Sequence, residues 1–473
     1  MAKVTPSNRK GKDTVIVKTQ YDKIRSPQQA YRWWNTRASK DRYQQILETF
    51  SYIKQNQQYR FRQAGIYARM YGNMPLFNIG GSTISRFSAP NNLPIDRPTM
   101  NVIQSCIDTK VSRLSQDRPS PVFLTDNADY KQRTLAKQMN SFISGELYQV
   151  KAYQLGEAVL RDADIFGTGC LKIYKSVDNK VGVERVLETE LFVDVNDGLY
   201  GDPRQLYHAR LVDRGVLEEI FPEYRSEIAK AENAYPDQSG DAQKTIADQV
   251  MVVEAWHLPS SPEADDGMHS IVCSAGEIFQ EKYTKKKFPF VFLQSNPRPL
   301  GFWGQGVPER LMGTQVEINK LLMTISQSIN LVGVPRVFVE DGSKVVKAHI
   351  NNQIGAIVTY RGTKPQYEVA PCVPVEIYAQ LQRLIDYAYN QEGVGALMAT
   401  GQKPAGLNSG EAQRTYEDIQ SDRFAALQKR YSNMYVDLSY QIIDHAIEIA
   451  EETGKYQTVF PDRKSTRLNS SHG

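Results

Sequence analysis

The stretch 308–454 constrains the fold most, because it reads as helix, small β-like insert, helix, glycine-rich loop and long helix. The first helix is predicted over 308–333, where Pro308 suits a first turn and Pro335 ends the helix. Its apolar residues recur on steps of three, four and seven, as one face of an α-helix requires; they are Leu311, Ile318, Leu322, Ile325, Ile329 and Val332. Three polar residues are expected elsewhere on its surface, namely Gln315, Asn319 and Gln327.

The remainder of this stretch continues the pattern. The insert holds β-rich runs at 337–339 and 356–360, and a second helix is predicted over 375–391 with Leu381 and Leu384 on its apolar side. Four glycines and a proline make 393–407 a loop. A helical pattern then continues to Gly454 without proline, which at 1.5 Å per residue spans roughly 60 Å. Such a helix must lie along a large body.

Composition bounds the class of protein. The chain has 473 residues, of which 23% are charged and 41% hydrophobic, so it is globular and long enough for more than one domain. The four cysteines are widely spaced and form no C-x-x-C pair, which favours free thiols in a reducing compartment. No apolar run approaches membrane-spanning length, and the N-terminus lacks a signal-peptide core. We therefore expect assembly in the cytoplasm.

The last twelve residues affect the charge balance. Residues 462–473 resemble a translated sequencing-library adapter, so we expect the genuine sequence to be interrupted after about Pro461. They carry three basic residues and one acidic residue, so the net charge of +4 falls by 2 to +2 without them. A nearly neutral body does not argue for a tight nucleic-acid binder.

The N-terminal region departs from this neutrality. Residues 1–25 carry seven basic residues against Asp13 and Asp22, which indicates a basic flexible arm that either touches nucleic acid or acidic partners, or is simply solvated. Helical sequence follows to about Tyr71, with aromatic residues and arginines interleaved over 59–71. Such a pattern is typical of internal packing and subunit interfaces, and less often of base stacking.

The middle of the chain predicts an α+β body. Helices are expected at 101–116 and 128–165 and a short one at 216–220. Strand-like runs are expected at 170–174, 182–186, 191–195, 205–211, 250–258, 270–274, 277–283 and 288–293.

The sequence offers no convincing catalytic constellation. Gly401–Gly406 superficially suggests a phosphate-binding loop, but its lysine precedes the second glycine and its proline removes an amide donor. The histidines are scattered, and the acidic pairs Asp265–Asp266 and Asp194/Asp197 are more typical of solvated loops than of cation sites. We therefore expect no enzyme, no cofactor and no metal.

Three local sequences and their order resemble the portal proteins of tailed bacteriophages, especially the short-tailed phages. Residues 162–174 resemble the passage from a helix through two glycines into the first wing strand. Residues 302–319 are similar to the passage into the first stem helix, and 392–413 to the tunnel loop and the start of the long wing helix. The resemblance covers most of 100–454.

The resemblance implies an α+β portal-like fold with a helical stem, a small α/β clip, a mixed wing and long helices. The implied segments are the arm 1–25, the wing 26–300, the stem helices 301–334 and 374–391, the clip 335–373, the tunnel loop 392–409 and the long helix 410–461 beneath a missing crown. The stem's apolar residues would then pack on neighbouring subunits; they are Leu311, Ile318, Leu322, Ile325, Ile329, Leu381 and Leu384.

The resemblance also implies function. The chain would be one subunit of a ring, typically a dodecamer, at the capsid portal vertex of the virion, assembled in the host bacterial cytoplasm without a membrane. Double-stranded DNA would pass, weakly bound, during packaging and ejection, because tight phosphate contacts oppose sliding. Its implied partners are terminase, tail or adaptor proteins, and the major capsid and scaffold proteins. The implied contact residues are Gly395, Thr400, Gln402, Lys403 and Asn408 in the tunnel loop, and Lys344, Lys347, Arg361 and Lys364 on the clip.

Two alternatives stay open. Another phage structural protein, from a tail or a scaffold, would also lack catalytic motifs but should lack this order of elements. A nucleic-acid-binding module built on the basic and aromatic N-terminal helices should bind DNA as a monomer, with strong salt dependence. An enzyme with unfamiliar motifs ranks below both.

Overall fold

The fold was analysed in a computed structural model of the chain, which describes residues 32–73, 98–125, 129–176, 178–233, 248–333, 336–338, 366–368, 374–394, 424–454 and 456. The arm 1–25, the strand expected at 356–360 and the tail 462–473 lie outside these residues.

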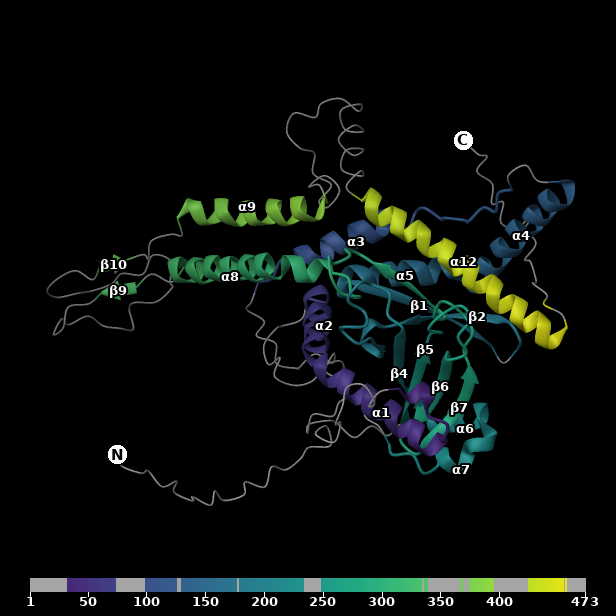
Figure 1. Cartoon of the computed structure of the whole chain (residues 1–473). Helices are drawn as coiled ribbons and strands as arrows, with labels where there is room; N and C mark the ends of the chain where they lie inside the picture. The colour runs from purple at the N-terminus through teal and green to yellow at the C-terminus, as the bar shows by residue number, and fades with distance from the viewer. Residues whose placement is uncertain are drawn as a thin grey trace, which may run out of the picture.

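The described chain is a mixed α+β protein, as predicted (Figure 1). Its longer helices are α1 (Ser39–Asn56), α2 (Gln58–Tyr71), α3 (Val102–Leu114), α4 (Tyr130–Gln149), α5 (Ala152–Phe166), α8 (Val307–Gly333), α9 (Val375–Glu392) and α12 (Ala425–Thr453). The short helices are α6 (Arg214–Ile220) and α7 (Arg225–Ile228).

Two antiparallel sheets form the centre of the body. One has the order β2-β1-β8, with β1 (Thr168–Lys175), β2 (Val181–Val186) and β8 (Phe290–Gln294). The other has the order β3-β4-β5-β6-β7, with β3 (Leu191–Phe192), β4 (Gln205–Asp213), β5 (Gln249–His257), β6 (Met268–Cys273) and β7 (Gly276–Lys282). The predicted strands are thus confirmed with shifted ends, except that the run at 191–195 forms only the two residues of β3.

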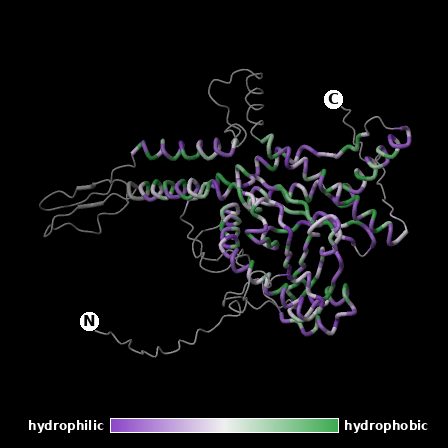
Figure 2. The backbone as a smooth tube through the Cα atoms, viewed as in Figure 1, coloured by the Kyte–Doolittle hydropathy of each residue, from purple (hydrophilic) through white to green (hydrophobic). Residues whose placement is uncertain are grey.

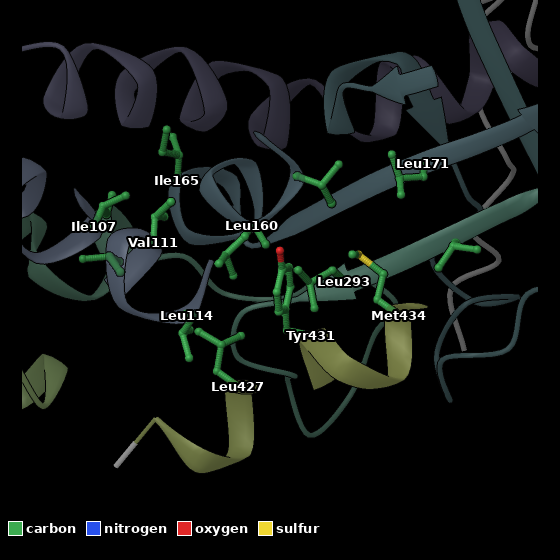
Figure 3. Packing of buried hydrophobic residues seen from close by; sticks show 14 of the residues in the cluster. Ile107, Val111, Leu114, Leu160, Ile165, Leu171, Leu293, Leu427, Tyr431 and Met434 are labelled. Atoms are coloured by element: carbon green, nitrogen blue, oxygen red, sulfur yellow. The ribbon is translucent and has the colours of Figure 1, made fainter. Parts of the chain in front are cut away.

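The largest hydrophobic core lies where α3, α5 and α12 meet the smaller sheet (Figure 3). Ile107 and Val111 of α3 pack near Leu160 of α5, and Tyr431 and Met434 of α12 close the same cluster. This core joins residues more than 300 positions apart, so the long C-terminal helix is part of the body. The described part of the predicted long helix ends at Gly454. Its φ of 76° is a left-handed conformation, which glycine adopts readily at a helix end because it has no side chain.

One helix prediction was wrong. The sequence 128–165 reads as continuous, but the chain forms α4 and α5 with a break at Val150 and Lys151. Lys151 adopts a left-handed conformation with φ of 54°, which is uncommon outside glycine. No glycine or proline announces this break, so the local pattern could not reveal it.

A second core joins α1 to the larger sheet. The Trp33 indole N–H donates to the hydroxyl of Tyr207 at 2.9 Å, and both side chains are fully buried. Arg42 of α1 forms a buried bidentate pair with Glu277 of β7, at 2.6 and 2.7 Å. The helix α1 is therefore fixed to the larger sheet.

The helices α8 and α9 lie side by side and project from the body, with the short ribbon of β9 (Arg336–Phe338) and β10 (Gln366–Glu368) at their far end (Figure 1). Hydrophobic and hydrophilic residues are mixed along both helices (Figure 2). The helices predicted at 308–333 and 375–391 are confirmed within one residue. The strand β10 was not predicted.

Candidate functional site: the helix pair and its junction with the body

The predicted apolar face of the helix pair meets two environments. Near the body, Leu311 and Ile318 are 1% and 0% exposed and belong to the chain's own core, so neighbouring subunits are not needed to bury them. Ile325 is 8% exposed, and three residues are half-buried against the same core, namely Leu322, Leu381 and Leu384. Toward the far end Ile329 is 58% exposed, so this end of the face remains uncovered.

Two apolar side chains at the outer end of α9 are also exposed, Val375 at 78% and Tyr378 at 45%, whereas the exposed Tyr387, at 57%, lies nearer the body. Soluble proteins rarely expose contiguous apolar surface, and where they do, that surface commonly marks an interaction site. The outer half of the pair is therefore a candidate interface.

The inner half of α8 is held by a buried amide that the sequence did not reveal. Gln315 was expected on the surface, but it is 6% exposed. Its Oε1 accepts from the Val102 backbone N–H at 3.0 Å, at the start of α3, and its Nε2 donates to the Met100 carbonyl at 2.6 Å. The expectation was wrong because the first turn of a helix leaves free N–H groups, and here α8 supplies their acceptor.

The inner end of α9, where the helix meets the body, lies at a buried ionic group. The carboxylate of Glu392 accepts from Lys110 of α3 at 2.5 Å and also pairs with Arg310 of α8. The side chains of Glu392 and Lys110 are 0% and 4% exposed. One carboxylate thus joins three helices at the last residue of α9, where the segment expected to be the tunnel loop begins.

The same junction holds a small polar cavity of about 160 Å³. Its walls include Lys110, Arg310 and Glu392, together with Arg430 from the start of α12. Arg430 donates through Nε to the Gln294 carbonyl at 3.0 Å, which ties α12 to the end of β8. Beside it, Ser295 donates to the buried Asp164 carboxylate at 2.5 Å, and burial raises the pKa of Asp164. Both helices that flank the undescribed segment 395–423 are therefore anchored at one point.

Glycines allow the chain to reach the start of α8. Gly167, with φ of 108°, ends α5, and the backbone of Gly304 crosses it closely. A Cβ placed on Gly304 would lie 2.2 Å from the Gly167 carbonyl oxygen, which no side chain permits. The two motifs that suggested the family resemblance, at 162–174 and 302–319, thus meet in the fold.

Comparison with known families decides the identity of this arrangement. The family model described as the phage SU10 portal protein matches residues 209–457, which is more than half of the 473 residues. The match spans the larger sheet from β4 onward, both helices of the pair and α12. The chain belongs to this family.

The family resemblance seen in the sequence is therefore confirmed, and the chain is a phage portal protein, a component of the virion. No curated protein matches the chain. The predicted tunnel-loop and clip residues lie outside the described part of this portal protein; they are Gly395, Thr400, Gln402, Lys403 and Asn408, and Lys344, Lys347, Arg361 and Lys364. Their roles remain predictions.

The body of the portal protein also contains a buried ionic group between its two sheets. Lys172 of β1 pairs with Glu254 of β5 at 2.6 Å, and His208 and His269 approach the same carboxylate at 3.6 and 3.9 Å. Burial opposes the charged form of both imidazoles, but the facing carboxylates outweigh it, so the pKa of each histidine lies above the ordinary 6.5. Burial also opposes the charge of Glu254, yet Lys172 and the histidines hold its pKa well below 4.5. These charged contacts connect the two sheets.

The aromatic and basic residues of α2 serve internal packing. Arg60 pairs with Glu188 at 2.9 Å and its guanidinium lies 3.9 Å from the ring centroid of Trp303. Tyr67 is 8% exposed, and Tyr71 donates to Asp108 at 2.8 Å. In this series Tyr59, at 74%, and Arg62 are exposed. These contacts disfavour the base-stacking alternative.

The acidic pairs stabilise local turns. Asp194 accepts from the Asn196 backbone N–H at 2.9 Å, and Asp197 from the Arg204 backbone N–H at 2.7 Å. Asp265 pairs with Lys282. Among the described residues, no group of histidine, cysteine, aspartate or glutamate side chains has the arrangement of a metal site. Within the same residues, no helix is both long and apolar enough to cross a membrane.

Proposed function

We propose that the chain is a ring subunit of the capsid-vertex channel through which phage DNA is packaged and ejected. The observation that carries this proposal is the family match across β4, the helix pair and α12. The projecting pair supports it, because α8 and α9 leave the body together and carry uncovered apolar residues at their outer half. Neighbouring pairs in a ring would bury those residues.

In this proposal the predicted segments keep the roles that the resemblance implies. The pair forms the stem, 335–373 the clip that docks terminase and later tail or adaptor proteins, and 392–409 the tunnel loop beside the DNA. Lys403 makes a transient phosphate contact. The nearly neutral net charge of the chain supports weak, sliding contact with DNA, since each firm phosphate contact adds affinity and opposes movement.

The anchored junction supports a further part of the proposal. Glu392 fixes the last residue of α9 to α3 and α8, and Arg430 fixes the start of α12 to β8. In this proposal the tunnel loop leaves the body from a fixed point, the inner end of α9. Among the described residues, no group of side chains is arranged for catalysis. We therefore propose a structural role without enzymatic activity.

The proposal is tested by negative-stain imaging combined with mass measurement of the purified chain. Rings with a central hole and about twelve subunits, as the family resemblance implies, are the expected result. A closed dimer, or a filament without a channel, would contradict the proposal. DNA binding by a monomer with steep salt dependence would favour the nucleic-acid-binding alternative instead.

A further inference from the structure

The first half of α4 is an uncovered prong. In Figure 1, α4 extends beyond the sheets at the end of the molecule opposite the β9–β10 ribbon. The buried residues of α4 begin only at Ile143, whereas Tyr130 is 80% exposed and Leu135 57%. A helix of this length gains little stability from its backbone alone and normally packs an apolar face on a partner. We call residues 130–138 the α4 prong.

The α4 prong is basic. It carries Lys131, Arg133 and Lys137 and no acidic residue. Tyr130, Arg133 and Lys137 follow steps of three and four and therefore share one face, whereas Lys131 and Leu135, four residues apart, lie together on the other side of the helix. Within the described part of the chain, none of the three basic side chains has an ion pair. The prong thus offers positive charge and apolar surface together, both unused.

The outer face of α12 offers the complementary surface. Five residues on steps of three and four form a stripe along its solvent side: Val436, Tyr440, Asp444, Ile447 and Glu451. The three apolar members are 40%, 58% and 52% exposed in this order. Asp444 and Glu451 have no ion-pair partner among the described side chains. We call this surface the α12 stripe.

We propose that the α4 prong of one copy of this chain docks on the α12 stripe of the next copy. Basic side chains of the prong meet Asp444 and Glu451, while Tyr130, on the same face as Arg133 and Lys137, covers exposed apolar members of the stripe. The inference rests on the proposed ring and specifies one of its contacts. Because the prong and the stripe are different surfaces, the contact is head-to-tail, and head-to-tail contacts close into rings when the rotation permits.

Size and charge favour a second copy over other occupants. The prong is about 12 Å long and the stripe about 22 Å, at 1.5 Å per residue, so the stripe accommodates the whole prong. DNA would satisfy the prong alone and would be repelled by the acidic stripe. A second copy satisfies both surfaces at once.

The proposal is tested first by disulfide cross-linking. Cys106, Cys170 and Cys273 are buried, so all variants carry only Cys372→Ser as background. Under oxidising conditions, a variant with Lys137→Cys and Asp444→Cys should give a ladder of covalent oligomers. A mixture of the two single variants should give covalent dimers only, and each single variant alone should give none. A cross-link confined within one chain would overturn the proposal.

Charge reversal supplies the second test. Replacing Lys131, Arg133 and Lys137 by glutamate should weaken self-association at least about tenfold at low salt and less at high salt, because salt screens exposed charges. Adding Asp444→Lys and Glu451→Lys to the same chain should restore association. The exposed Lys230→Glu change on the wing serves as the matched control and should leave association unchanged. Circular dichroism verifies that each variant is folded.

The outcomes separate this inference from the proposed function. Intact rings without a cross-linked ladder would overturn the prong–stripe contact and leave the ring function standing. A ladder from a chain that forms open filaments rather than rings would support the contact and contradict the function. Charge reversal that weakens DNA binding without weakening self-association would also overturn the contact.

Discussion

The two halves of the helix pair α8–α9 differ in what covers their apolar residues. At the inner half, Leu311 and Ile318 lie in the chain's own core, Gln315 bonds the start of α3, and Glu392 joins three helices. At the outer half, Ile329 and Val375 are exposed, although the same two helices carry the same apolar periodicity there. The comparison teaches that one chain specifies the direction of the pair, whereas no described part of the chain covers its outer half.

The largest expected effect is at the inner end of α9. Glu392→Ala leaves Lys110 and Arg310 close together without their shared carboxylate, and unpairing a buried charge costs about 3–5 kcal/mol in the free energy of unfolding. Denaturant unfolding followed by circular dichroism measures it. Glu376→Ala, at the exposed start of the same helix, is the control, with an expected loss below about 1 kcal/mol. Equal losses for the two variants would contradict the proposed anchor.

The second prediction compares two isoleucines of α8. Ile318→Ala should lower the free energy of unfolding by about 2–5 kcal/mol, because it opens a cavity in the core. Ile329→Ala should change the unfolding of the isolated chain by less than about 0.5 kcal/mol, since its side chain is exposed. In the assembled state the order should reverse for ring yield, with Ile329→Ala lowering it. Sedimentation velocity measures the yield, and a ring unaffected by Ile329→Ala would contradict the proposed outer interface.

A smaller effect is expected at Gln315. Gln315→Leu keeps the approximate volume but leaves the buried N–H of Val102 and the carbonyl of Met100 without their partner, at a cost of about 1–3 kcal/mol. Thermal unfolding is the measurement. The exposed Gln327→Leu change on the same helix should be nearly neutral. A neutral Gln315→Leu would mean that water replaces the amide.

The smallest effect is a pH dependence outside the helix pair. The raised pKa values of His208 and His269 contribute stability that is fully present below 6.5 and is lost as pH rises through the folded values. The lowered pKa of Glu254 contributes stability above 4.5, which is lost as pH falls through its folded value. We therefore expect stability to decline on the alkaline side of 6.5. Replacing both histidines with glutamine should flatten that decline, and an unchanged slope would contradict the assignment.

Much of the fold follows from periodicity alone. The ends of α8 and α9 agree with the predicted helices because long apolar repeats and flanking prolines are local signals. The break at Lys151 was missed because its left-handed backbone carries no glycine to announce it.

The junction could not be predicted for a different reason. Lys110 and Glu392 are 282 positions apart, so only the tertiary fold brings them together. Likewise, Gln315 has the polar character of a surface residue, and its burial depends on the start of α3 lying against α8. The apolar pattern placed these residues on helices, but it could not distinguish Ile318 in the core from Ile329 outside it, since both fall on the same period.

The most direct test of the account is a cryo-electron microscopy reconstruction of the purified assembly. The account predicts a closed ring in which the outer halves of α8 and α9 pack on the neighbouring pair, with Ile329 buried between chains around an axial channel. A ring in which Ile329 faces solvent would contradict the role of the outer half, and an assembly without an axial channel would contradict the portal function itself.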